Sequence, residues 1–169
     1  GDWLPTGAMG VGMALALYLF FAKVLGSPHG LEPVKWSRVW FAVGSGDDGF
    51  RLDFGVLVDN LGVIMLVVVT VVSFLVHLFS VGYMHADPLY SRFFAFLALF
   101  TFSMLGLCIT SNLLFLFIFW ELVGVCSYFL IGFWFEKKSA SNAAIKAFLT
   151  TRVGDLGFFL AILIIAAVV

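Results

Sequence analysis

Apolar residues run along this chain in segments long enough to cross a lipid bilayer, and short polar stretches separate them. A helix needs about 20 predominantly apolar residues to span the roughly 30 Å hydrocarbon core of a membrane. By this measure the sequence predicts an all-α polytopic membrane protein with about five transmembrane helices. Their expected ranges are 8–25, 61–81, 93–109, 113–135 and 142–169.

The third and fourth ranges come from one apolar stretch, residues 93–135, that is too long for a single crossing. As one helix, its residues would extend roughly 64 Å at 1.5 Å per residue, about two bilayer cores. The Thr-Ser-Asn run at 110–112 offers capping side chains near the middle, so a turn is expected there. Similar polar pairs at 59–60 and 141–142 predict the starts of the second and fifth helices.

A substantial polar stretch, residues 27–60, separates the first two predicted helices. Residues 50–54 alternate between apolar and polar side chains, and residues 36–43 are rich in aromatic and β-branched types. The Gly- and Asp-rich run at 44–49 between them is typical of a turn. We therefore expect an extramembrane β-hairpin near 36–54.

Counting crossings places the two loops at 82–91 and 136–141 on one side of the membrane and the hairpin on the other. Basic residues flank both sides, so their distribution does not orient the chain. The chain also starts without Met and ends in a run that is still apolar. We therefore expect it to be a section of a longer protein.

Composition supports the membrane class and excludes several others. Hydrophobic residues make up 63% of the chain and charged residues 11%, against roughly 25% charged in a soluble domain. A net charge of −1 without a basic stripe argues against a nucleic-acid partner. Cys108 and Cys126 lie in apolar runs without CxxC spacing, and no metal site is expected from the His, Cys and carboxylate pattern.

Three ionisable residues stand well inside the predicted helices: Glu121 in the fourth, and Arg152 and Asp155 in the fifth. Such a residue costs at least about 2.5–3.5 kcal/mol at the centre of a span, so it normally faces a protein interior or a water path and has a partner. Counted from the shared loop, Glu121 lies roughly 21 Å deep and Asp155 roughly 20 Å deep. Arg152 and Asp155 are three residues apart, so a local ion pair between them is geometrically easy.

Two interpretations of these charges remain open. Carboxylates whose proton affinity is set by burial and by movable cationic partners form a proton-handling cluster. Alternatively, a static interhelical ion pair only fixes helix packing. Glu121 has no cation on its own helix, so it must be protonated or pair with a cation elsewhere.

Lys146 and His77 are further candidates. Lys146 precedes Asp155 by nine residues, which turns it to the opposite helix face, and it either joins a proton path or extends to the membrane interface. His77, in the last turns of the second helix, is either an interfacial hydrogen-bonded residue or a proton relay.

The stretches HLFSVGYMHADPLYSRFF (77–94), NLLFLFIFWELVGVCSYFLIGFWF (112–135) and KAFLTTRVGDLGFF (146–159) resemble the antiporter-like L subunits of bacterial respiratory complex I, the NADH:quinone oxidoreductase. The resemblance runs from about Arg51 to the end of the chain. The FWELVG and RVGD motifs in this order are specific to the antiporter-like superfamily and less specific for one member.

The resemblance implies a proton-translocating membrane subunit, in which a buried Glu/Lys ion-pair switch is coupled to electron transfer elsewhere. Glu121 matches the family's buried glutamate, whose lysine partner lies on a later helix beyond Val169. Arg152 and Asp155 match an arginine–aspartate pair linked to neighbouring proton routes. Lys146 and His77 fall on family-like positions with less defined roles.

The resemblance also implies the surroundings of the chain. Its expected partners are other membrane subunits of complex I, the lipid bilayer and protons. No cofactor is expected in this chain, because FMN, iron–sulfur clusters and quinone belong to other subunits of the family. The implied location is the bacterial inner membrane, with the hairpin on the periplasmic side.

Two parts follow from this layout: residues 1–60, a first helix plus the hairpin, and residues 61–169, the incomplete start of an antiporter-like transmembrane module. Two other functions remain open at this stage. One is the A subunit of a multi-subunit Na⁺/H⁺ antiporter or a related hydrogenase module. The other is a structural subunit whose charges only hold helices together.

Overall fold

A computed structural model describes residues 2–27, 31–43 and 50–168 of the chain. Five helices of this part are long and apolar enough to cross a membrane, which confirms the predicted polytopic α-helical class. The elements in chain order are α1 (Trp3–Leu19), continued by the π-helix η1 (Phe20–Leu25), β1 (Val34–Val43), β2 (Phe50–Val58), α2 (Asn60–Tyr83), α3 (Tyr90–Ile109), α4 (Leu113–Ile131) and α5 (Lys138–Val168).

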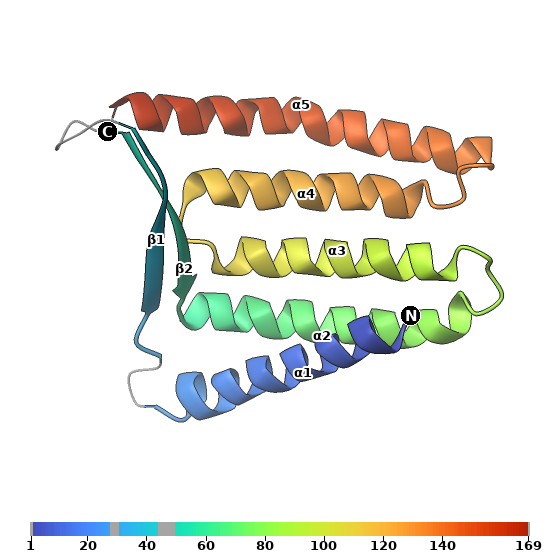
Figure 1. Cartoon of the computed structure of the whole chain (residues 1–169), viewed down its shortest axis with the longest axis horizontal. Helices are drawn as coiled ribbons and strands as arrows, with labels where there is room; N and C mark the ends of the chain where they lie inside the picture. Colours follow the sequence, from blue (N-terminus) through green and yellow to red (C-terminus); the bar gives the residue numbers. More distant parts are fainter. Residues whose placement is uncertain (1, 28–30, 44–49, 169) are drawn as a thin grey trace.

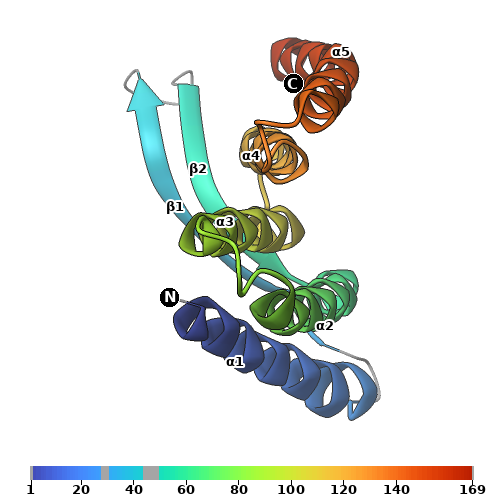
Figure 2. The ribbon, with the colours of Figure 1, turned by 90° about the vertical axis from the view of Figure 1, so that its right-hand side faces the viewer.

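The helices form a single curved row in the order α1, α2, α3, α4, α5 (Figures 1 and 2). Each helix packs against its neighbours in sequence. Short loops join α2, α3, α4 and α5, as expected for neighbouring antiparallel helices, whereas the hairpin connects α1 to α2. The α2–α3 and α4–α5 loops lie at one end of the helices and the hairpin lies at the opposite end (Figure 1). This arrangement agrees with the predicted sides of the loops and of the hairpin.

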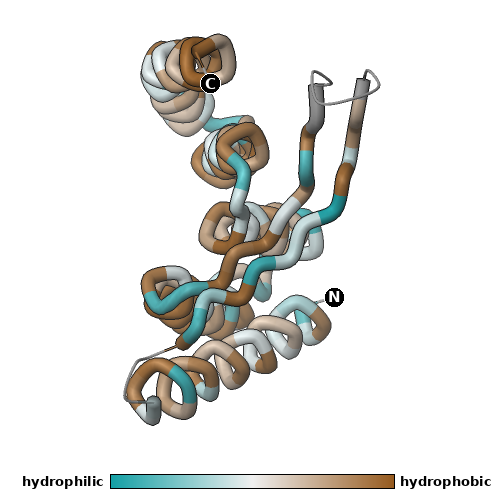
Figure 3. The backbone as a smooth tube through the Cα atoms, turned by 90° about the vertical axis from the view of Figure 1, so that its left-hand side faces the viewer, coloured by the Kyte–Doolittle hydropathy of each residue, from teal (hydrophilic) through white to brown (hydrophobic). Residues whose placement is uncertain are grey.

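Helix α3 approaches α4 closely at Gly106. The ring of Phe119 lies over this residue, and a Cβ atom added there would overlap the ring. Small residues allow this kind of close contact between membrane helices, where packing replaces the hydrophobic driving force. The helices are mostly hydrophobic along their length, whereas polar residues recur along the hairpin strands (Figure 3).

Side-chain caps start two of the helices where the sequence predicts them. The Asp59 carboxylate accepts a hydrogen bond from the Gly62 N–H at 2.7 Å at the start of α2. The Asn112 side-chain oxygen accepts from the Leu114 N–H at 2.8 Å at the start of α4. Each cap satisfies a backbone donor that the first helical turn leaves without an intrahelical partner.

The predicted boundaries between α4 and α5 are wrong. Helix α4 ends at Ile131 rather than at 135, and α5 begins at Lys138 rather than at 142. The polar pair at 141–142 lies inside α5, where the Ser141 N–H donates to the Lys137 carbonyl. Packing decides these boundaries, because Ala144 is buried beside Gly132, where α4 ends.

The hairpin near 36–54 is confirmed and is longer than predicted. Strands β1 and β2 are antiparallel, from the pair Val34 and Val58 to the pair Val43 and Phe50, with an irregularity between Val39 and Phe41. The predicted turn at 44–49 lies outside the described residues.

The hairpin is attached to the turn between α3 and α4. The Ser111 N–H donates to the Gly55 carbonyl at 3.1 Å, and the Asn112 side-chain amide donates to the Asp53 carbonyl at 3.2 Å. Gly55 approaches Ser111 so closely that a Cβ atom would overlap the serine hydroxyl. Asn112 therefore caps α4 with its oxygen and binds β2 with its nitrogen.

These two roles of Asn112 can be separated by substitution. Asn112→Ala should lower the free energy of unfolding by about 0.5–2 kcal/mol, because both hydrogen bonds are lost. Asn112→Asp retains the cap acceptor and loses only the donor to Asp53, so the decrease should be smaller. Chemical unfolding of the purified protein in detergent measures both values.

Asn142→Ala provides the matched control, because Asn142 is exposed inside α5 and caps nothing. Its unfolding free energy should stay within about 0.5 kcal/mol of the unaltered protein. A decrease as large as that of Asn112→Ala would contradict the observed start of α5.

Candidate functional site

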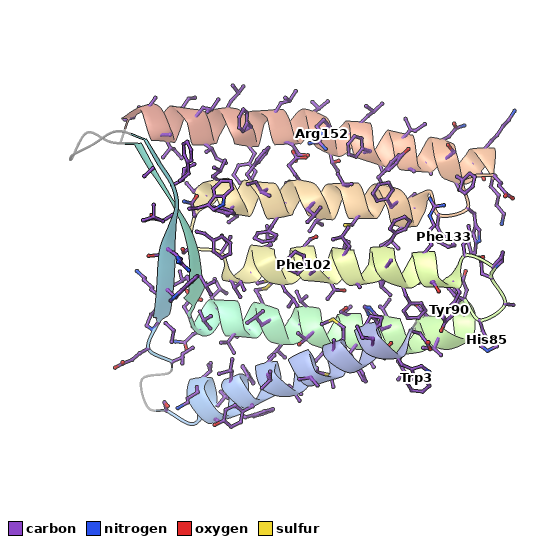
Figure 4. The ribbon with its side chains drawn as sticks, in the orientation of Figure 1. Trp3, His85, Tyr90, Phe102, Phe133 and Arg152 are labelled. Carbon is purple, nitrogen blue, oxygen red and sulfur yellow. The ribbon has the colours of Figure 1, made fainter. Side chains whose placement is uncertain are left out.

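Glu121 of α4 and Arg152 of α5 form an ion pair between the two helices. The Nη1 atom of Arg152 donates to Oε2 of Glu121. The pair is partly buried, with 34% of the Arg152 side chain and 19% of the Glu121 side chain exposed. Figure 4 shows Arg152 near the middle of α5. The cation that Glu121 lacks on its own helix is therefore supplied by the neighbouring helix.

Aromatic packing also positions Arg152. Its guanidinium lies over the ring of Phe148, one turn earlier on α5, at 4.6 Å from the ring centroid. A cation over an aromatic face is attracted by the negative face of the ring. The guanidinium thus has an anion on α4 and an aromatic ring on its own helix.

Asp155 takes a different partner from the one that sequence spacing favours. Its carboxylate is buried, at 8% exposure, and Oδ1 accepts a hydrogen bond from Nε1 of Trp120 at 2.8 Å. The ion pair that the structure gives Arg152 is with Glu121, so the local pair between Arg152 and Asp155 is not the observed arrangement. Adjacent residues of α4, Trp120 and Glu121, contact Asp155 and Arg152 of α5 respectively.

The two contacts place Glu121, Arg152 and Asp155 at one level of α4 and α5. This result agrees with the predicted equal depth of the two carboxylates. Arginine cannot lose its proton in a protein, so the members of this cluster that can bind and release protons are the two carboxylates.

Trp120 is the residue of this site that sequence reasoning missed. Tryptophan in membrane helices usually lies at the interface, whereas Trp120 stands eight residues into α4, beside a charged residue. Its indole N–H needs an acceptor when it is away from water. A tryptophan inside a span is therefore a signal that could have indicated a partner such as Asp155.

A groove of about 840 Å³ runs along α3, α4 and α5 beside this cluster. Trp120 and Asp155 lie on its wall with Ser127 and Thr151, and most of the remaining lining is apolar. In the ranges that the structure describes, no three His, Cys, Asp or Glu side chains gather as metal ligands would.

The other two candidates lie outside the cluster. Lys146 is exposed, on the far side of α5 from buried Asp155, as the nine-residue spacing predicts. His77 is fully buried in α2, and its Nδ1 lies 2.8 Å from the Ser73 carbonyl oxygen. Helices α2 and α5 are separated by α3 and α4 in the row (Figure 2), so His77 belongs to a different part of the molecule.

Two family models match the chain. Residues 40–94 match the model described as NADH-ubiquinone oxidoreductase (complex I), chain 5 N-terminus. Residues 110–168 match the model described as NADH:quinone oxidoreductase/Mrp antiporter, TM. The second match contains all of the Glu121, Arg152 and Asp155 cluster.

Curated relatives agree with these matches. The chain is 48% identical over 158 residues to the chloroplastic NAD(P)H-quinone oxidoreductase subunit 5 of Nephroselmis olivacea, covering 93% of this chain and 24% of the relative. It is 45% identical over 155 residues to the NAD(P)H-quinone oxidoreductase chain 5 of a Picosynechococcus strain, covering 92% of this chain and 22% of the relative. The chain thus spans about a quarter of the length of these relatives. It belongs to the complex I chain 5 family of antiporter-like membrane subunits and matches the N-terminal part of that family.

Proposed function

We propose that this chain forms part of a proton-translocating membrane subunit of an NADH:quinone oxidoreductase. The observation that carries the proposal is the ion pair between Glu121 and Arg152, formed by two helices long and apolar enough to cross a membrane. Charged groups at such depth are expensive and usually mark ion or proton routes. The names of the relatives, all quinone oxidoreductase subunits, support the same conclusion.

In the proposed mechanism Glu121 binds and releases a proton as its cationic partner changes. A nearby positive charge favours the ionised carboxylate, and withdrawal of that charge favours proton uptake. A lysine from a part of the protein beyond Val169 would alternate with Arg152 as this partner. Electron transfer in other subunits, which would hold the FMN, iron–sulfur clusters and quinone, would drive the alternation.

The geometry offers Arg152 a second carboxylate. Asp155 lies one turn along the same helix face, and its Oδ1 is occupied by the Trp120 indole. We infer that this hydrogen bond keeps Asp155 from competing for the guanidinium, so that Arg152 remains paired with Glu121. Movement of Arg152 toward Asp155 would remove the positive charge from Glu121 and favour its protonation.

Further parts of the proposal extend beyond this cluster. Lys146 would take part through groups outside the described residues, because it is exposed on the far face of α5. The proposed location is a bacterial inner membrane, with the hairpin on the periplasmic side and other membrane subunits of the complex as neighbours.

The second family model also names the Mrp antiporter, so a Na⁺/H⁺ antiporter subunit is the alternative function. It would use the same carboxylates without electron transfer. Proton translocation that requires NADH oxidation favours the respiratory subunit. Sodium-driven proton flux without NADH would favour the antiporter.

Glu121→Gln tests the proposal in the assembled complex. The variant removes the proton-binding group and retains the side-chain shape, so the number of protons translocated per quinone reduced should fall by about tenfold or more. The measurement uses membrane vesicles that contain the whole complex, with proton uptake and NADH oxidation recorded together.

Glu136→Gln is the matched control, because Glu136 is exposed in the loop after α4. Its proton-to-quinone ratio should be unchanged. An unchanged ratio in Glu121→Gln with a lower amount of assembled complex would instead assign Glu121 to helix packing, and the proposal would fail.

The role inferred for Trp120 predicts how strongly Glu121 and Arg152 interact. A double-mutant cycle with Glu121→Gln and Arg152→Gln, followed by unfolding in detergent, should give a coupling of about 0.5–3 kcal/mol. In a Trp120→Phe background this coupling should decrease, because Asp155 loses its donor and competes for Arg152.

Trp134→Phe is the control background. Its indole N–H also donates to a carboxylate, that of Asp87, at 2.9 Å, but at an exposed position between two loops. The coupling between Glu121 and Arg152 should stay the same in that background. Equal coupling in the Trp120→Phe and Trp134→Phe backgrounds would contradict the inferred role of Trp120.

A further inference from the structure

Helix α2 buries a stripe of polar residues from the middle of its apolar span toward its end. Thr70, Ser73, His77 and Ser80 are spaced by three or four residues and therefore share one face. Their exposed fractions are 2%, 9%, 0% and 3%, while large apolar side chains of the same helix face outward. Polar residues in membrane helices that face the bundle interior hold helices together by hydrogen bonds or mark a route for ions.

Neighbouring helices complete the surroundings of this stripe. On one side the Met9 sulfur of α1 lies 3.4 Å from the Ser73 hydroxyl, and on the other the Thr101 hydroxyl of α3 lies 2.6 Å from it. The ring of Phe94, also on α3, is 6.0 Å from the His77 ring between centroids. We call this place, where α1, α2 and α3 meet around Ser73 and His77, the α2 seam.

The donors of two hydrogen bonds in the α2 seam, those to the Leu97 and Ser73 carbonyls, follow from the fact that a carbonyl only accepts. Thr101 donates its hydroxyl hydrogen to the Leu97 carbonyl at 2.9 Å, so its oxygen accepts from Ser73. Nδ1 of His77 lies 2.8 Å from the Ser73 carbonyl oxygen. A carbonyl only accepts, so Nδ1 must carry a hydrogen.

This assignment fixes the role of the other ring nitrogen. In a neutral imidazole with hydrogen on Nδ1, Nε2 holds a free lone pair and is an acceptor. Nε2 of His77 is buried and makes no hydrogen bond to any part of the chain that the structure describes. Buried polar atoms nearly always have a partner, so an unpartnered acceptor at this depth requires an explanation.

We propose that Nε2 of His77 is a second proton-accepting site of this protein, separate from the pair of Glu121 and Arg152. The site takes a hydrated proton: one O–H bond breaks, an Nε2–H bond forms, and a water molecule remains. The Nδ1–H bond to the Ser73 carbonyl is retained throughout, so the ring is held in place while its charge changes. Release of the proton from Nε2 restores the starting state without any change in electron count.

The separation from the first site is structural. Glu121 and Arg152 join α4 to α5. His77 instead contacts residues of α2 and α3. This inference rests on the proposed function of proton translocation, and it adds a position where a proton is held within the membrane.

His77→Asn tests the site, because the two nitrogens of histidine have separable roles. The asparagine amide can donate to the Ser73 carbonyl as Nδ1 does, but it offers no titrating acceptor in place of Nε2. His77→Gln has a side chain long enough to place an amide near the position of Nε2, again without a titrating group. In vesicles that contain the whole complex, both variants should assemble and should lower the protons translocated per quinone reduced by at least about twofold.

His85→Asn is the matched control, because His85 is exposed in the loop after α2, and its ratio should be unchanged. A normal ratio in both His77 variants, with Glu121→Gln impaired, would overturn this site and leave the proposed function standing. A normal ratio in Glu121→Gln would instead remove the proposed function. Failure of both His77 variants to assemble, while His85→Asn assembles, would assign His77 to packing and also overturn the site.

Discussion

A charged side chain inside a bilayer needs a partner within the protein, and this constraint organises the half of the row that contains α4 and α5. Water is absent from the hydrocarbon core, so Glu121 obtains its partner from an adjacent helix. In a single row each helix has at most two neighbours, which limits the source of that partner. The ion pair with Arg152 sets how far α5 is shifted along α4. The hydrogen bond between Trp120 and Asp155 adds a second point and fixes how α5 is rotated about its axis.

The hairpin is attached to the start of the helix that carries Glu121. Asn112 attaches the first turn of α4 to β2, and Glu121 follows nine residues later, roughly 14 Å along the helix. Gly55 of β2 also approaches Ser111 of the same turn closely. The position of Glu121 along α4 is therefore related to the contacts between the start of α4 and β2. The hairpin and the ion pair are thus connected through one helix, α4.

Sequence reasoning predicted the spans and the hairpin because hydropathy and alternation are strong signals over many residues. It misplaced the boundary between α4 and α5, because a capping pair at 141–142 is a local preference that the packing of Ala144 overrides. It favoured Arg152 with Asp155 because spacing along one helix is visible in a sequence, while a contact between two helices is not. The burial of His77 was missed for the same reason, since a nearly uniform apolar helix does not reveal which face is covered.

The dual role of Asn112 has a mechanical consequence. One side chain both caps α4 and binds β2. A displacement of the hairpin along the helix axis would therefore be transmitted directly to α4. An axial slip of α4 by one residue would shift Glu121 by about 1.5 Å relative to Arg152, about half the length of a hydrogen bond. A displacement of the hairpin along this axis would therefore change the register of the ion pair between Glu121 and Arg152.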